Sequence, residues 1–304
     1  MIAGQKQARI AWRGTSRGSV TLIHRHRWLA PLLLLAPGLA WLAVFFLVPL
    51  GFLGYQSLES GSFETGYSFT WEFSNFWDAI TGYDEQLIRS FLYAGIATVA
   101  TLLISYPLVY WIAFHGGRWK NLLLLFIVAP FFVTYLIRTL AWQNILADEG
   151  PVVGFLRNMH VLDADGRLLA TTLAVVAGIT YNFLPFMALP VYVSLEQIDA
   201  RLLEAAQDLY ASKTKAFLRV TLPLSAPGIV AGTLLTFIPA AGDFINAQLL
   251  GTPNQYMIGN VIQSKYLELI DYPAAASLSF VLMALIMISL LVYARVVGTE
   301  RLTG

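Results

Sequence analysis

The chain has 304 residues, of which 57% are hydrophobic and only 12% are charged, with a formal net charge of +1. A soluble domain carries about twice that share of charged residues, so the composition excludes an ordinary soluble fold. The chain has no cysteine, which excludes a disulfide framework and a thiolate metal site.

The apolar residues gather in runs of about twenty or more, the length of a helix that crosses a hydrocarbon core. Alternating segments of about ten residues, typical of a transmembrane barrel, are not found. The first run, from Trp28 to about Leu53, follows a basic stretch. It is too long for the apolar core of a cleavable signal, so we predict a retained first span behind a basic tail of residues 1–27.

Six transmembrane helices are predicted, over Leu29–Ser57, Gln86–His115, Asn121–Ile145, Ala170–Val193, Leu224–Leu249 and Pro273–Val296. Lys and Arg concentrate before the first span, in every second loop and after the last span. Because basic residues stay on the cytoplasmic side, both termini are predicted to be cytoplasmic. The fold class is therefore an all-α, polytopic membrane protein. Its domain of residues 28–298 is followed by a short cytoplasmic C-terminus, residues 299–304.

The loops on the opposite side are acidic, which indicates either a solvated surface or a docking rim with a mild attraction for cations. In the last of them, apolar residues between Gln255 and Ile270 recur at helical spacing and predict an interfacial or re-entrant helix.

Prolines interrupt two of the predicted spans. Pro185 and Pro190 lie in the fourth, and Pro239 lies in the fifth, close to Gly242. Proline removes a helical hydrogen bond, and in lipid the freed carbonyl must find another partner or face a water-filled cavity. The prolines are consistent either with kinks that only shape packing or with broken helices that surround a transport pathway.

A polar loop, residues 197–223, separates the fourth and fifth spans. Asp199 is placed to cap a first short helix, whose apolar residues share one face, and Ser212 is placed to cap a second one. Two short helices held at both ends by transmembrane helices form a rigid lever. A membrane protein rarely keeps such a structured loop unless something outside the bilayer grips it.

The polar loop resembles the EAA loop of the permeases of ABC importers, in which EAA is followed by three residues, Gly, nine residues and Ile-x-Leu-Pro. The matching residues are Glu204, Ala205, Ala206, Val220, Leu222 and Pro223. The family glycine falls at Tyr210. Because a positive φ is costly for Tyr, we expect either a reshaped turn or a longer first helix.

The resemblance implies that a cytoplasmic ATPase subunit holds this loop. The coupling residues it implies are Glu204, Ala205, Ala206, Asp208, Tyr210, Ala211, Ser212, Leu222 and Pro223. The chain has no phosphate-binding motif of the type G-x-x-x-x-G-K-[ST]. We therefore expect no catalytic residue and no bound cofactor in this chain, with ATP and Mg on partner subunits. The four His residues show no spacing typical of a metal site.

Two further passages resemble permeases of the spermidine/putrescine type. The first runs from Leu136 to Trp142, and the second combines Ala241-Gly242-Asp243-Phe244 with Met257-Ile258-Gly259-Asn260. Related importers of other small solutes share parts of these passages. The solute is therefore expected to be a polyamine, with another small solute as the alternative.

Asp243 is an ionisable group near or within a span, which is costly unless it is paired or faces a cavity. A polyamine needs carboxylates and aromatic faces, so the candidate pathway residues are Asp243, Phe244, Tyr181, Asn182, Arg138 and Trp142. Asp243 and Arg138 are alternatively a structural ion pair or gate elements. Trp142, with Tyr135, is alternatively part of the aromatic belt at the membrane interface.

The sequence thus predicts a permease subunit in a bacterial cytoplasmic membrane, surrounded by lipid. By resemblance, its partners are a second homologous permease, a dimer of ATPase subunits and an external solute-binding protein, and it has no nucleic-acid partner. The alternative from another class is a stand-alone ion-coupled transporter or channel, in which Asp243 and Arg138 form a relay for protons or cations.

Overall fold

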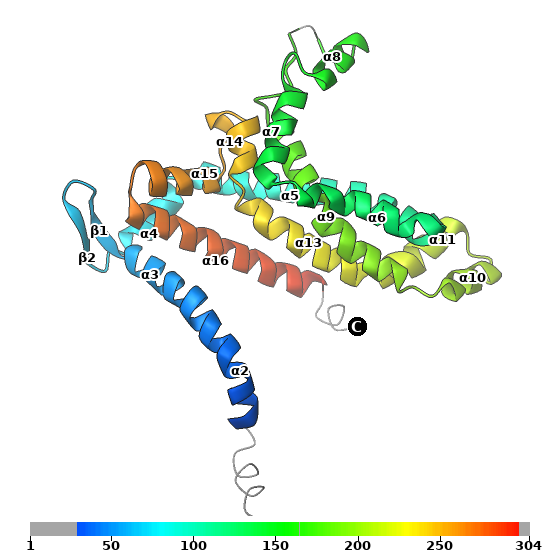
Figure 1. Ribbon diagram of the computed structural model, residues 1–304, viewed down its shortest axis with the longest axis horizontal. Coiled ribbons are helices and arrows are strands. Elements are labelled where there is room, and N and C mark those ends of the chain that lie inside the picture. The colour runs from blue at the N-terminus through cyan, green and yellow to red at the C-terminus, as the bar shows by residue number, and fades with distance from the viewer. Residues whose placement is uncertain (1–28, 164, 298–304) are drawn as a thin grey trace, which may run out of the picture. The chain divides into compact units, whose positions relative to one another are not determined.

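The structure, a computed structural model, describes residues 29–163 and 165–297 (Figure 1). The predicted tail of residues 1–27 and the C-terminal segment 299–304 lie outside these residues. The described chain is built almost entirely from helices, as expected. It divides into two units, one up to Leu53 and the other from Gly54 onwards.

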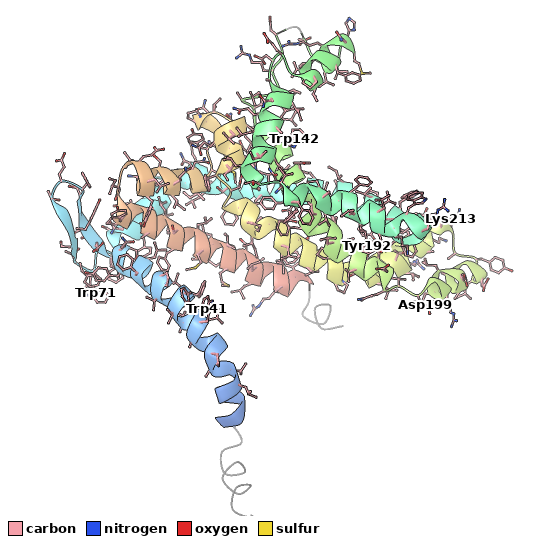
Figure 2. The ribbon with its side chains drawn as sticks, in the orientation of Figure 1. Trp41, Trp71, Trp142, Tyr192, Asp199 and Lys213 are labelled. Atoms are coloured by element: carbon pink, nitrogen blue, oxygen red, sulfur yellow. The ribbon has the colours of Figure 1, made fainter. Side chains whose placement is uncertain are left out.

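The first unit contains one helical rod. It consists of α2 (Leu29–Leu42), the π-helical turn η1 (Ala43–Leu47) and most of α3 (Val48–Gln56). No charged residue occurs in this stretch, and most of the large side chains between Leu34 and Phe52 are exposed, Trp41 among them (Figure 2). A helix that is apolar on all sides is suited to lipid. The segment Leu34–Gln56 is long and apolar enough to cross a membrane.

The second unit is organised around four long helices: α5 (Asp84–His115), α9 (Thr172–Glu196), α13 (Ala226–Ala241) and α16 (Tyr272–Val297). Close packing between α9 and α13 depends on Gly228 and Gly232 of α13. A Cβ atom at Gly232 would lie 2.7 Å from the sulfur of Met187, and one at Gly228 would meet the backbone of α9 at Pro190. Small residues four apart let two helix backbones approach closely in a membrane.

The third predicted span, Asn121–Ile145, is not one straight helix. The short turn η2 (Gly117–Trp119) leads into α6 (Lys120–Val128) and η3 (Ala129–Phe132), and the chain then bends by 96° into α7 (Tyr135–Leu146). Val133 and Thr134 are extended at the bend. The helix α8 (Pro151–Asn158) follows, and α7 and α8 project away from the long helices (Figure 1).

The fifth predicted span, Leu224–Leu249, is also shorter than expected. Helix α13 ends at Ala241, two residues after Pro239, and a separate helix α14 (Ile245–Leu250) follows the break at Gly242. In contrast, α9 continues unbroken through Pro185 and Pro190, which agrees with the alternative that these two prolines only shape packing. The described residues contain four continuous candidate spans, and six if each bent helix pair counts as one.

The end of the second unit opposite the polar loop carries smaller elements. A hairpin precedes α4 (Ser74–Thr81). It consists of the antiparallel strands β1 (Glu59–Ser62) and β2 (Gly66–Phe69), which pair from Glu59↔Phe69 to Ser62↔Gly66. The predicted helical stretch after Gln255 is confirmed as α15 (Ile258–Gln263) and the π-helical η6 (Ser264–Glu268), preceded by the turn η5 (Pro253–Gln255).

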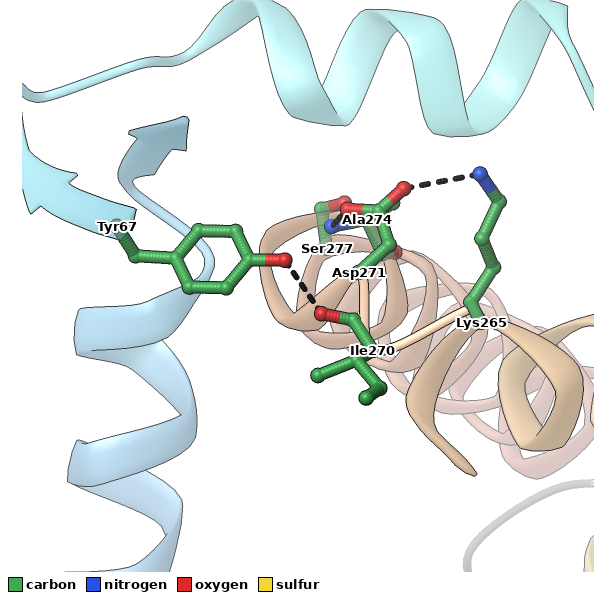
Figure 3. Close-up of polar contacts among 6 residues, drawn as sticks. All are labelled: Tyr67, Lys265, Ile270, Asp271, Ala274 and Ser277. Carbon is green, nitrogen blue, oxygen red and sulfur yellow. Dashed lines mark hydrogen bonds and ion pairs between the residues drawn. The ribbon is translucent and has the colours of Figure 1, made fainter. Parts of the chain in front are cut away.

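Polar contacts join the hairpin to the start of α16 (Figure 3). The hydroxyl of Tyr67 donates to the carbonyl of Ile270, and Nζ of Lys265 lies 2.9 Å from the carboxylate of Asp271. Burial lowers the pKa of Lys265, but its hydrogen bond with Asp271 and the charge of that carboxylate outweigh the burial, so the pKa is raised overall. The ion pair ties η6 to the residue directly before α16.

Candidate functional site

The polar loop folds as two short capped helices followed by a return into the membrane helix α13. They are α10 (Ala200–Asp208) and α11 (Lys213–Ala216), with η4 (Phe217–Thr221) and α12 (Leu222–Leu224) completing the loop. The carboxylate of Asp199 accepts the backbone N–H of Arg201 at 2.9 Å, and the hydroxyl of Ser212 accepts that of Lys215 at 3.3 Å. Both predicted caps are confirmed; Asp199 and Lys213 mark the starts of the two helices in Figure 2.

The turn between the two helices keeps the geometry that glycine would adopt. Tyr210 has a φ of +58°, and the N–H of Ala211 donates to the carbonyl of Ala206 at 3.0 Å, the bond that closes a helix with a left-handed residue. α10 ends at Asp208. The expected reshaping or lengthening is therefore wrong, since the chain accepts a left-handed Tyr at a cost of about 1 kcal/mol.

The tip of the loop is exposed while its base is packed. Tyr210 is 97% exposed and Leu209 is 82% exposed. Of the predicted coupling residues, Glu204, Ala205, Asp208, Ser212 and Pro223 are exposed, and Ala206, Ala211 and Leu222 are half-buried.

Phe217 anchors the base of the loop. Its ring meets Tyr106 and Tyr110 of α5 edge-on at centroid distances of 5.8 and 5.7 Å. Tyr106 also shares a hydrogen bond of 2.9 Å with Ser225, directly before α13. A force applied at the tip therefore reaches α5 and α13 through packed contacts.

The second candidate site surrounds Asp243, which follows the break after α13 and is only 7% exposed. Its Oδ1 accepts the hydroxyl of Tyr135 at 2.7 Å, and its Oδ2 accepts the backbone N–H of Asn246 at 3.1 Å. A buried carboxylate requires such donors. Here all the donors seen are neutral.

The hydrogen bonds continue from Asp243 through three elements. Nδ2 of Asn246 donates to the Tyr135 hydroxyl at 2.6 Å, and Nδ2 of Asn182 donates to Oδ1 of Asn246 at 3.1 Å and to Thr139 at 3.2 Å. We call these five residues, Tyr135, Thr139, Asn182, Asp243 and Asn246, the polar network. It joins α7, α9 and the start of α14. Oδ1 of Asn182 is buried without a hydrogen-bond partner.

Arg138 lies beside the polar network but does not pair with Asp243. No ion pair links these two described side chains, so the predicted structural pair is wrong for this conformation. Arg138 is 8% exposed, and its guanidinium carbon lies 5.4 Å from the ring centre of Phe131 and 5.6 Å from that of Tyr135. Its Nε and Nη1 atoms are buried and find no acceptor.

The other predicted pathway residues are not part of the polar network. The rings of Trp142 and Tyr181 pack together at 5.4 Å, and Tyr181 also borders an apolar pocket of about 330 Å³. The carbonyl of Phe244 accepts Nδ2 of Asn260 at 2.8 Å. Tyr135, Thr139 and Asn246 were not predicted from the sequence as site residues. For Asn246 a signal was present, because an amide side chain three residues after Asp243 is unusual in an apolar stretch.

The two sequence passages around Asp243 and Gly259 come together in space. A Cβ atom at Gly259 would lie 2.6 Å from the carbonyl oxygen of Gly242, so only glycine allows this approach. This contact holds the backbone at Gly242, where α13 ends and directly before Asp243. Within residues 29–163 and 165–297, no group of three or more His, Asp or Glu side chains is placed to hold a metal ion.

Comparisons with known proteins agree on one family. Residues 106–299 match the family described as "Binding-protein-dependent transport system inner membrane component". The chain is 40% identical to the spermidine/putrescine transport system permease protein PotB of Escherichia coli over 70% of this chain and 78% of the relative. It is 37% identical to PotB of Haemophilus influenzae over 84% of this chain and 90% of the relative.

Solved structures support the same fold. A bacterial alginate ABC transporter, in complex with an alginate pentasaccharide-bound periplasmic protein, aligns with a TM-score of 0.69 at 19% identity over 93% of this chain and 98% of that chain. The MetNI methionine ABC transporter in an inward-facing conformation aligns with a TM-score of 0.51 at 18% identity, over 74% of this chain and 97% of that chain. At these identities the likeness concerns the fold alone.

Proposed function

Since the chain belongs to the family of binding-protein-dependent transport system inner membrane components, we propose that it is the transmembrane permease subunit of a bacterial ABC importer for polyamines. It is a multi-pass protein of the inner membrane, as its family and its candidate spans indicate. The polyamine substrate class is supported by the relatives named as spermidine/putrescine permeases and by the buried carboxylate of Asp243. Both termini lie in the cytoplasm in this proposal.

The observation that carries the proposal is the polar loop with its exposed tip and packed base. In the proposed complex, Glu204, Ala205, Ala206, Asp208 and the turn Tyr210–Ser212 contact a cytoplasmic ATPase subunit. Leu222 and Pro223 join that contact surface to α13. Because Phe217 fixes the base of the loop against α5, movement of the ATPase is transmitted as movement of whole helices.

This chain supplies no chemistry of its own in the proposed importer. ATP and Mg are bound by a dimer of partner ATPase subunits, whose closure drives the permease between two packed states with different affinities for the substrate. A second homologous permease completes the pathway. An external solute-binding protein docks at the end that carries the hairpin, where Glu59 and Asp78 line a pocket of about 320 Å³.

The proposed substrate path passes the polar network. Asp243 accepts an ammonium group of the polyamine in place of its neutral donors, and Asn182 lies two hydrogen bonds away from it. Phe244, Tyr181 and Trp142 supply aromatic faces for cation–π contact. Arg138 does not bind the substrate in this way, because it is itself a cation and repels an ammonium group.

Purification of the complex from native membranes tests this proposal. An ATPase that copurifies with the wild-type chain, but not with Glu204→Ala at equal membrane insertion, supports it. Uptake of polyamine by the isolated chain, driven by a proton gradient, contradicts it and favours a stand-alone ion-coupled transporter. Binding-protein-dependent uptake of another small solute, with no polyamine uptake, contradicts the substrate class alone.

A further inference from the structure

Arg138 is a buried cation whose environment the proposed function leaves unexplained. The residue is only 8% exposed and its guanidinium remains charged at any pH that a protein survives, so burial without an anion is costly. The two aromatic rings beside it stabilise the cation from its faces. They cannot accept the hydrogen bonds of Nε and Nη1, which stay unpaired.

An acceptor for Nε and Nη1 becomes available only when the Arg138 side chain moves. Nε and Nη1 are already inaccessible in the isolated chain, so a second subunit that covers the surface cannot reach them unless the side chain moves. Asp243 is a candidate acceptor within this chain, because one residue, Tyr135, contacts both Asp243 and Arg138. The Tyr135 hydroxyl donates to Asp243, and the face of the same ring lies 5.6 Å from the guanidinium carbon of Arg138.

Asp243 has room for a second partner. Oδ1 accepts the hydroxyl of Tyr135 and Oδ2 accepts the N–H of Asn246, with the N–H of Ile245 and the side-chain amide of Asn246 also near the carboxylate; a carboxylate offers about four acceptor positions. A bidentate contact with a guanidinium is the strongest pairing that a carboxylate makes with a side chain. In the present structure neutral donors contact the Asp243 carboxylate and aromatic rings contact the Arg138 guanidinium. A direct contact between these two charged groups would be stronger than either set of contacts.

The position of Arg138 also links it to the bend of the chain. Phe131 precedes the 96° bend at Val133 and Thr134, and Tyr135 follows it. The guanidinium contacts one ring from each side of the bend, so a change in the bend angle would alter at least one of these two contacts. Asp243 lies at the other break, after α13. Movement at either break changes the separation of the two charges.

We propose that Arg138 is the internal counter-ion of Asp243. Tyr135 holds the two charges apart in the present structure. In a second state of the transport cycle the guanidinium pairs with the carboxylate and displaces a cationic substrate from it. This inference rests on the proposed function, because it assumes that Asp243 receives an ammonium group. Arg138 would thus act in substrate release rather than in substrate binding.

The decisive variant is Arg138→Gln in the full complex of both permeases, the ATPase dimer and the binding protein, reconstituted in proteoliposomes with labelled spermidine. Without the Arg138 guanidinium, nothing displaces the spermidine ammonium group from the Asp243 carboxylate, so release of spermidine slows. We expect uptake to fall about tenfold while the spermidine retained by each complex rises about threefold, the mark of a release defect. The control, Arg167→Gln, removes an arginine whose side chain is 71% exposed and should change neither value.

A double variant tests the pairing itself. Asp243→Asn alone should lower both retention and uptake. Adding Arg138→Gln should then change nothing further, because the carboxylate from which Arg138 displaces the substrate is already absent. Additive losses, or a fall in both retention and uptake for Arg138→Gln alone, overturn the inference. If the wild-type complex takes up no spermidine, the proposed function fails. If wild type and Arg138→Gln transport equally, only the counter-ion role fails.

A second measurement applies if Arg138→Gln does not assemble. The chain contains no cysteine, so Arg138→Cys with Asp243→Cys introduces the only two thiols of this subunit. Their crosslinking yield should differ between the nucleotide-free complex and the complex trapped with ATP and vanadate. Equal yields in the two states overturn the inference.

Discussion

The polar loop and the polar network are built on opposite principles. In the loop, each feature depends on residues within five positions of one another: Asp199 caps at Arg201, Ser212 caps at Lys215, and Ala211 bonds back to Ala206. In the network, the partners of Tyr135 are more than 100 residues away in the chain. The loop is a local structure with an exposed surface, whereas the network exists only when three elements are assembled.

This contrast suggests that the two regions fail differently. Loss of one loop contact should leave the others intact, because each forms within its own helix end. Loss of one network contact leaves a buried polar atom unpaired, and its neighbours must rearrange. Variants in each region should distinguish these two kinds of failure.

Gly232→Leu should damage both regions at once, because α13 carries the loop at one end and the network at the other. The new side chain would enter space occupied by Met187, and overpacking of this kind costs about 1–3 kcal/mol or more. We expect a loss of the heat-stable fraction in detergent, measured by size exclusion after heating. Leu235→Ile, at an exposed position of the same helix, is the control. Equal stability of the two variants would contradict the close packing of α9 and α13.

Tyr135→Phe should destabilise the network and show coupling to Asn246. The change removes the hydroxyl that bonds both Asp243 and Asn246, and unpaired buried groups cost about 1–3 kcal/mol. Thermal stability of Tyr135→Phe, Asn246→Ala and the double variant should be clearly non-additive. Additive effects would show that the network is no more collective than the loop.

Asp199→Ala and Ser212→Ala should each lower the stability of the loop by about 1 kcal/mol, the usual value of a helix cap. The two losses should add, because the caps belong to different helices. Amide hydrogen exchange of α10 and α11 measures both effects, and Ser212→Asp should restore the second cap. Loss of exchange protection in both helices from a single cap variant would mean that the loop folds as one unit.

Tyr210→Gly should have the smallest effect on the fold and the opposite sign. Glycine accepts the φ of +58° without strain, so the turn should gain up to about 1 kcal/mol. The exposed ring is lost at the same time. If it contacts the ATPase as proposed, copurification of the ATPase should weaken although the turn is more stable, and Tyr210→Phe should keep it. Undiminished copurification with Tyr210→Gly would remove the ring from that contact.

The sequence was a good guide wherever the structure is local. The caps at Asp199 and Ser212, the helix after Gln255 and the membrane helices follow from composition, spacing and hydropathy. It was less informative where tertiary contacts decide. It left open whether Pro185 and Pro190 break α9, which they do not, because packing on α5 and α13 sustains that helix. The turn at Tyr210 keeps its left-handed form against the local preference of Tyr.

For the candidate site, the sequence identified the charged residues but not their partners. Asp243 and Arg138 are conspicuous as charges near membrane helices. Their shared contact with Tyr135 is formed next to the bend at Val133 and Thr134, which no periodicity shows. Asn246 and Thr139 gain their roles only because folding brings residues that are far apart in the sequence into hydrogen-bond contact.

The two helices that flank the polar loop, α9 and α13, also carry the network, with Asn182 in α9 and Asp243 just beyond α13. Asn182 lies fourteen residues before the end of α9 at Glu196, a length of about 20 Å along the helix. A relative tilt of about 10° between the two helices would shift their far ends by about 3–4 Å, which exceeds the reach of a hydrogen bond. Asn246 belongs to α14, beyond the break after α13, so its bond with Asn182 should break only when the tilt of α13 also carries α14 away from α9.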